Sequence, residues 1–176
     1  MAASDHDDTR RSKITADDSG QALVEFAIAA MMMLIIVFGL IDFCRAIYDQ
    51  QVITNLTGEG CSMSSRGTSL TDTVTSVIAS SAPLNLNASG RVIATSVLNN
   101  SGVLQVTGQV SQGGFVAASR IGAPGGLAHL PPAAVPQVNQ TVFVTEVYYQ
   151  YSSLTPIGNL LSRTILPSQM YDVAYY

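Results

Sequence analysis

The 176-residue sequence has no tryptophan, a single lysine (Lys13), two cysteines and only 11% charged residues. Its formal charge of −4 and pI near 4.8 argue against the basic face that nucleic acid requires. No Gly-x-Ser-x-Gly motif, Walker loop or Rossmann fingerprint is present, so no residue is a candidate for catalysis. His6 and His129 stand alone, without the ligand spacing of a zinc site. We expect a protein that is not an enzyme and binds no cofactor, metal or nucleic acid.

The two cysteines, Cys44 and Cys61, are poorly placed for a disulfide within the chain. A helix containing both would separate them by roughly 25 Å, because each residue adds about 1.5 Å. The Cα atoms of a disulfide lie within about 7 Å of each other. We therefore expect no internal disulfide, and favour buried or free thiols over a bridge between subunits.

One long apolar run extends from Ala22 to Ile41 and contains a single charge, Glu25. As a helix it spans roughly 30 Å, the hydrocarbon thickness of a bilayer. A cleavable signal peptide has a core of roughly 7 to 15 residues followed by small residues. Here the bulky and charged Asp42-Phe43-Cys44-Arg45 follows, so we expect the run to remain attached as one membrane-spanning helix.

The basic residues near this run predict its orientation. Arg10, Arg11 and Lys13 precede it, whereas Arg45 alone follows closely. The positive-inside rule counts Lys and Arg and largely ignores acids. The N-terminus is thus predicted to be cytoplasmic, with the rest of the chain outside the cytoplasm.

The first part of the chain divides into three predicted segments. Residues 1–20 are polar and lack apolar periodicity, so we expect a leader without regular structure. Residues 21–43 form the spanning part of a helix, which residues 44–66 continue as an amphipathic part. That continuation should end near Gly58 to Gly60 or at Gly67. Its predicted apolar face comprises Cys44, Tyr48, Val52 and Leu56, with Arg45, Asp49, Gln50, Thr54 and Asn55 elsewhere. Arg45 can pair with Asp42 or Asp49, which are three and four residues away.

Residues 67–176 are predicted to form a small extracytoplasmic domain. A helix is expected from Leu70 to Ala82, and a hairpin from strands at 91–98 and 103–110. The Gly- and Pro-rich segment 111–140 is a long loop, of a kind that is usually functional or disordered. A central strand follows at 141–151, and 170–176 can add a last strand. In the central strand, Phe143, Val147, Tyr149 and Tyr151 share one face and Val142, Val144 and Tyr148 the other. The predicted fold class is α+β: a long N-terminal helix packed on a small antiparallel sheet.

The residues around the start of the apolar run form a recognisable pattern. The segments Gly20-Gln21-Ala22-Leu23-Val24-Glu25-Phe26-Ala27 and Gly39-Leu40-Ile41-Asp42-Phe43-Cys44-Arg45 resemble the N-terminal region of the TadE-like pseudopilins of tight-adherence pilus systems. Val142 to Leu154 is weakly similar to a strand of that family. The resemblance implies a pilin-like protein of the inner membrane.

The resemblance also implies roles for particular residues. A prepilin peptidase would cut after Gly20, so that Gln21 becomes the new N-terminus. Glu25, followed by Phe26, would neutralise the N-terminal amine of a neighbouring subunit during assembly. Packing of the helix would involve Gly39, Asp42 and Arg45. The implied partners are the major pilin, other minor pilins, the peptidase, the inner-membrane assembly platform and the lipid bilayer.

Two alternatives remain open. A minor pseudopilin of a type II secretion system shares such a helix, although Gln21-Ala22-Leu23 fits its usual start less well. A periplasmic binding module or adhesin could use the helix only as a membrane anchor, and Glu25 would then be dispensable. The sequence leaves open whether a pilus subunit of this kind would initiate, cap or join the filament.

Overall fold

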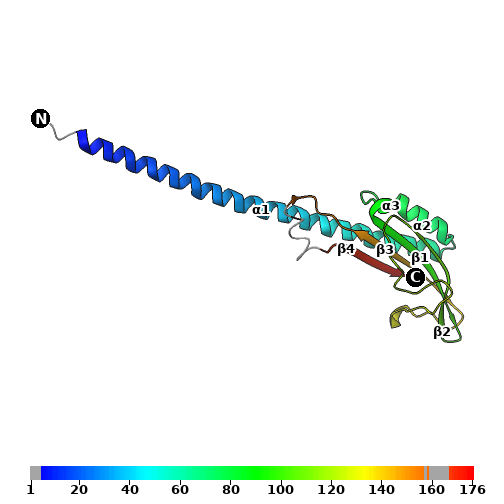
Figure 1. The fold of residues 1–176 in the computed structure, drawn as a ribbon. Helices are drawn as coiled ribbons and strands as arrows, with labels where there is room; N and C mark the ends of the chain where they lie inside the picture. The colour runs from blue at the N-terminus through cyan, green and yellow to red at the C-terminus, as the bar shows by residue number, and fades with distance from the viewer. Residues whose placement is uncertain (1–4, 157, 159–166) are drawn as a thin grey trace.

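The computed structural model describes residues 5–156, 158 and 167–176, with side chains from Gly20 onward. A long helix projects from a small domain that contains a four-stranded sheet (Figure 1). The elements are α1 (Asp5–Ser65), α2 (Leu70–Ala79), α3 (Leu86–Ser89), β1 (Gly90–Asn100), β2 (Val103–Gln112), the 3-10 helix η1 (Pro132–Ala134), β3 (Thr141–Gln150) and β4 (Gln169–Tyr175). The predicted α+β fold class is confirmed.

Helix α1 begins earlier than expected and ends within the predicted bounds. It begins at Asp5, so the expectation of a leader without regular structure is wrong for residues 5–20, while residues 1–4 lie outside the described residues. No proline interrupts this stretch, and extending an existing helix is far less costly than starting one. The helix passes through Gly58 and Gly60 and ends at Ser65. The stop comes at Gly67, whose φ of 93° suits glycine, and Thr68 N–H returns to the Met63 carbonyl.

The sheet is antiparallel, with strand order β2-β1-β3-β4. The predicted hairpin is β1 and β2, in which Asn100 pairs with Val103. Ser101 and Gly102 form its two-residue turn with φ angles of 53° and 92°, as the twist of a tight hairpin requires. Strand β3 lies between β1 and β4, so its predicted central position is confirmed.

The two faces of the sheet are covered by different parts of the chain. Helices α1 and α2 pack on one face, where Val147 and Tyr149 join a core with Ile53. On the other face, Val142 and Val144 of β3 pack with Ile121, Ala128 and other apolar residues. The predicted alternation of β3 is therefore confirmed. Much of the 111–140 segment, expected to be functional or disordered, serves as the second covering layer.

The buried face of α1 differs from the predicted one. Cys44 and Tyr48 are exposed, whereas Asp49 is buried, so the face drawn through Cys44 and Tyr48 is wrong. The buried residues recur every three or four positions: Asp42, Ala46, Asp49, Ile53, Leu56, Thr57, Gly60, Cys61 and Ser64. Several are polar because the domain supplies partners for them, for example Thr73 for Ser64. Apolar periodicity could not find a face of this composition.

Helix α2 begins as predicted but ends three residues early, at Ala79. Its N-cap is Ser69, whose hydroxyl accepts the Asp72 N–H. At the other end, the hydroxyls of Ser80 and Ser81 donate hydrogen bonds to carbonyl groups of the helix. Such side-chain bonds compete with the backbone bonds that would extend the helix, so it ends here. The short helix α3 was not expected from the sequence.

Candidate functional site

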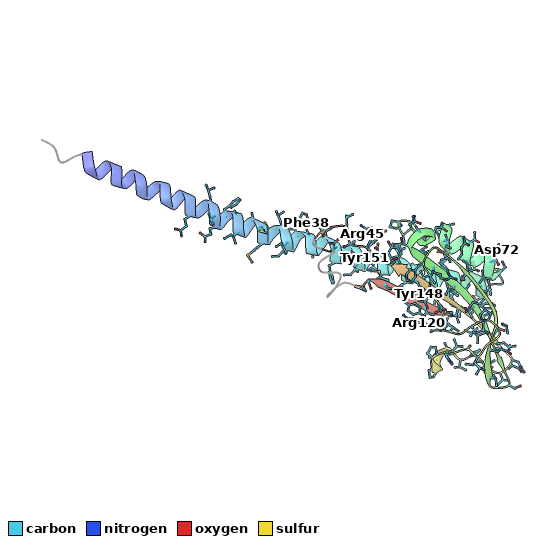
Figure 2. All side chains as sticks on the ribbon, viewed as in Figure 1. Phe38, Arg45, Asp72, Arg120, Tyr148 and Tyr151 are labelled. Atoms are coloured by element: carbon cyan, nitrogen blue, oxygen red, sulfur yellow. The ribbon has the colours of Figure 1, made fainter. Side chains whose placement is uncertain are left out.

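The projecting part of α1 leaves its apolar side chains exposed in the part of the chain that the structure describes. From Gly20 to Ile41 nearly every residue is exposed, and the most apolar 18-residue window, with mean hydropathy 2.6, is 0% buried. By length and composition this helix is able to cross a membrane. Figure 2 shows Phe38 on this part of the helix, and Arg45 and Tyr151 where the helix meets the domain.

The predicted processing and assembly residues lie on the outer part of this helix. Gly20, Gln21, Glu25 and Phe26 are all exposed, and Phe26 is 71% exposed. A Cβ added at Gly20 would meet nothing within 4 Å, so the fold makes no steric demand for glycine there. Glu25 has no ion pair among the described residues. The structure therefore brings none of these four residues to the domain.

Asp42 is held within the chain, at the end of the apolar run. Its side chain is fully buried and accepts hydrogen bonds from the N–H groups of Leu154, at 3.0 Å, and Thr155, at 3.3 Å. The Thr155 hydroxyl also donates to it. The Tyr151 hydroxyl donates to the Asp42 carbonyl oxygen at 3.0 Å. These contacts, which we call the Asp42 clasp, fasten the segment after β3 to α1.

A glycine completes this clasp. A Cβ at Gly158 would overlap the Asp42 carboxylate, and Gly158 N–H donates to the Thr155 hydroxyl at 3.0 Å. Asp42 was predicted to serve helix packing, and in the single chain its side chain is already occupied. The sequence carries no signal for the clasp, because its members are more than 100 residues apart.

The other two predicted packing residues, Arg45 and Gly39, are less buried than Asp42. The Arg45 guanidinium lies 3.9 Å from the carboxylate of Asp49, so of the two predicted partners the structure pairs it with Asp49. Asp49 is 3% exposed, and its Oδ2 has no hydrogen-bond partner. Burial raises the pKa of this carboxyl, which the charge of Arg45 partly offsets. Gly39 is half-buried.

The two thiols lie in contrasting environments. Cys44 is exposed, whereas Cys61 is fully buried against the sheet. The Cys61 thiol donates to the Phe143 carbonyl at 3.0 Å, and Ala174 offers a second carbonyl at 3.4 Å. Burial raises the pKa of Cys61 to about 11, so its thiol is a poor nucleophile. Both cysteines are free.

A buried carboxylate on the opposite face of the sheet was missed by the sequence analysis. Glu146 of β3 is fully buried and accepts the Arg120 N–H at 2.9 Å and the hydroxyls of Tyr148 and Tyr171 at 3.1 Å each. The Ser119 hydroxyl donates to it as well. The only sequence signal is that strand alternation places this acid on the same face as Val144 and Tyr148.

The surroundings of Glu146 indicate a structural role. Burial and the nearby Glu146 carboxylate raise the pKa of Tyr148 to about 12, and the same causes raise the pKa of Tyr171. The Arg120 guanidinium lies 3.8 Å from the centre of the Tyr171 ring, a cation–π contact on the side of the sheet away from α2 (Figure 2). The cluster binds residues 118–120 of the 111–140 segment to the sheet. Among the described residues no group of three His, Cys, Asp or Glu could hold a metal ion.

These observations define a class of protein: one helix that could span a membrane, attached to a small α+β domain by polar contacts at the end of its apolar run. Residues 20–61 match the family described as TadE-like protein. This match covers about a quarter of the chain and confirms the resemblance of its N-terminal region to the TadE-like proteins. No curated protein and no solved structure matches the chain.

Proposed function

We propose that this protein is a minor pilin or pseudopilin that takes part in assembling a tight-adherence, type IV-like pilus, without enzymatic activity. Its helix would sit in the inner membrane first and in a helical bundle of subunits afterwards. The domain would lie outside the cytoplasm and supply further contacts to the pilus. The observation that carries this proposal is the projecting helix from Gly20 to Ile41, which is apolar on every side and almost fully exposed among the described residues.

The proposed cleavage after Gly20 is supported by the fold. Glycine inside a helix costs about 0.5–1 kcal/mol relative to alanine. No neighbour requires it at Gly20, and the family match begins at this residue. A residue without a side chain lets an extended backbone enter a protease cleft closely. The leader would then have to leave the helical state while it is being cut.

The proposed role of Glu25 follows from its isolation. It is the only charged residue between Gly20 and Ile41, and a charge in the bilayer costs on the order of 3 kcal/mol on insertion scales. Cleavage before Gln21 would create a positive amine four residues away along the chain. A neighbouring subunit with that amine at the level of Glu25 would neutralise both charges. The free-energy cost of leaving Glu25 unpaired in the bilayer would thus favour the axial offset between subunits at which Glu25 meets that amine.

The test of cleavage is to express the full chain with and without a prepilin peptidase and to sequence the N-terminus of the membrane-bound product. We expect a start at Gln21 only when the peptidase is present. Gly20→Val should abolish cleavage and leave the domain folded, because no neighbour lies near that position. Gly58→Ala, at another exposed glycine of α1, is the matched control and should be cut normally. An uncut wild-type chain in both strains would support the membrane-anchored adhesin instead.

The role of Glu25 is tested with Glu25→Gln in a strain that makes pili. Processing and membrane insertion should be unchanged, while the amount of subunit recovered with pili should fall by about tenfold, which corresponds to about 1.4 kcal/mol. Glu59→Gln is the matched control, since Glu59 is an exposed acid on the part of α1 beside the domain. Equal recovery of Glu25→Gln and wild type would show that charge neutralisation is not the role of this residue.

A further inference from the structure

The two edge strands of the sheet, β2 and β4, differ in whether other described residues pair with their outer backbone groups. At the β2 edge, the 122–128 segment pairs with the outward backbone groups of the strand. Ala128 N–H donates to the Leu104 carbonyl at 2.9 Å, and Val106 exchanges hydrogen bonds of 3.0 Å with Gly125 and Gly126. This part of the β2 edge is therefore already occupied by the chain itself.

The β4 edge has no such cover among the described residues. Phe143 and Tyr176 exchange two hydrogen bonds of 2.9 Å, and the pairing with β3 continues without a shift to Gln150 and Gln169. In an antiparallel pair every second residue bonds inward. The N–H and C=O groups of Tyr171, Val173 and Tyr175 therefore point away from the sheet. No hydrogen bond from these groups to another described residue is present.

The β4 edge has few of the features with which proteins usually protect exposed strands. It contains no proline, no lysine and no bulge. Its single charged residue, Asp172, is on the α1 side and accepts the Thr57 hydroxyl at 3.3 Å. The side chains beside the open backbone groups are two tyrosines and a valine, all half-buried. The edge thus offers alternating donors and acceptors, with the Arg120 guanidinium on the Tyr171 ring as a nearby charge. Another extended chain matches such an arrangement of backbone groups.

A hollow of about 430 Å³ lies at the end of this edge. It is bounded by Tyr175 and Tyr176, by the 131–136 segment and by the start of β3, and none of its lining residues is charged. An added strand that runs beside β4 would reach this hollow with one of its side chains. Its lining favours an apolar or aromatic side chain there.

A second copy of the chain is a poor occupant of this edge. Figure 1 shows α1 running along β4 and leaving the domain at one end. A two-fold axis that pairs β4 with its copy in antiparallel fashion would also reverse α1. The two projecting helices would then leave in opposite directions, so both could not span one membrane. This step alone rests on the proposed function.

We propose that the open edge of β4 binds an extended, uncharged segment of another protein as a fifth strand of the sheet, with an apolar side chain of that segment in the adjoining hollow. The backbone groups of Tyr171, Val173 and Tyr175 provide the hydrogen bonds. The hollow selects which segment fits. The domain then serves as a receptor for a peptide strand, in addition to the proposed role of α1 in the membrane and in helix packing.

The test uses the full chain in detergent and a capped peptide of about eight residues, a common strand length, with alternating threonine and valine and a final phenylalanine. Amide hydrogen exchange is measured residue by residue. At saturating peptide, the exchange rates of Tyr171, Val173 and Tyr175 should fall by about tenfold or more, because protected amides exchange only when the pairing opens. The rates of Met170, Asp172 and Ala174, which already bond to β3, should not change.

Two controls separate backbone pairing from nonspecific binding. The same peptide with methyl groups on alternate backbone nitrogens should give no protection. Val173→Pro removes one outward donor and leaves the bonds to β3 in place, as proline is tolerated where an edge N–H faces outward. This variant should bind the unmodified peptide more weakly. If the variant does not fold, the methylated peptide still tests whether binding depends on backbone hydrogen bonds.

Three results would overturn the proposal: no protection at saturating peptide, equal protection by the methylated peptide, or protection of the same amides at high protein concentration without peptide. The last result would assign the edge to a second copy. None of these measurements involves processing or pili. A failure of the proposed pilus function and a failure of strand binding are therefore distinguishable.

Discussion

Asp42 shows at the scale of one residue how the spanning helix is joined to the domain. Its carboxylate receives two backbone N–H groups and a hydroxyl from the segment after β3. Asp49, two buried positions further along the same helix face, has an oxygen with no hydrogen bond. Two buried aspartates on one helix thus differ in what they stabilise.

We predict that Asp42→Ala lowers the free energy of unfolding by about 1–3 kcal/mol, since buried donors lose their acceptor. Asp49→Ala should be close to neutral, because its ion pair with the half-exposed Arg45 is long, at 3.9 Å, and its Oδ2 accepts no hydrogen bond that would be lost. Denaturant unfolding of the full chain in detergent, followed by tyrosine fluorescence, measures both. Equal losses for the two variants would mean that the clasp does not hold the domain to the helix.

The raised pKa of Cys61 leads us to predict that the free energy of unfolding falls at alkaline pH. Burial raises the pKa of its thiol from 9.0 to about 11 in the folded chain, so the unfolded chain releases this proton at lower pH. The stability contributed by the neutral thiol is complete below pH 9 and is lost as the pH rises to about 11.

The same unfolding measurement between pH 8.5 and about 11 should give a shallower decline for Cys61→Ala than for wild type. Cys44→Ala is the control and should keep the wild-type profile, because Cys44 is exposed. An unchanged slope in Cys61→Ala would show that this thiol titrates similarly in both states.

At the scale of the element, α1 contains two glycines with opposite environments within one turn. A Cβ at Gly60 would lie 2.9 Å from methyl groups of both Thr145 and Val77, where the helix crosses β3 and α2. A Cβ at Gly58 would meet nothing within 4 Å. The close approach of α1 to the domain therefore depends on Gly60 alone of these two.

Gly60→Ala should therefore destabilise the domain by about 1–3 kcal/mol, the usual range for overpacking. Gly58→Ala should stabilise it by about 0.5–1 kcal/mol, because alanine is the better helix former. Thermal unfolding of the two variants beside wild type measures the difference in sign. If both variants moved in the same direction, the packing of α1 on β3 would differ from that described here.

In the whole molecule, the exposed apolar part of α1 is joined to a domain with a hydrophobic core. The basic residues before the apolar run predict a cytoplasmic N-terminus. In Cys44→Ala chains, a cysteine placed at Ser101 in the exposed hairpin turn should react with a membrane-impermeant maleimide on intact spheroplasts. A cysteine at Arg10, in a strain without the peptidase, should react only after permeabilisation. The reverse pattern would contradict the predicted orientation.

Features with a short sequence period were predicted well. The apolar run, the hairpin at Ser101 and Gly102 and the two faces of β3 follow from repeats of two or of three to four residues, which local sequence specifies directly. The segments 20–27 and 39–45 were enough to indicate a resemblance to the TadE-like family, which the match over residues 20–61 confirms. The buried face of α1 was predicted wrongly, because it includes acids and hydroxyls that apolar periodicity treats as exposed.

By itself the sequence determined that the protein has one membrane-length helix, a small antiparallel sheet and a family pattern beginning at Gly20. Only the tertiary structure decided that Asp42 is bound by the segment after β3 and that Glu146 accepts hydrogen bonds from Ser119 and Arg120. It also decided that no described residue pairs with the outer edge of β4. The physical reason is the distance along the chain over which the interactions act. Helix and strand patterns depend on neighbours a few residues away, whereas a buried polar group is tolerated only when distant parts of the chain bring it a partner.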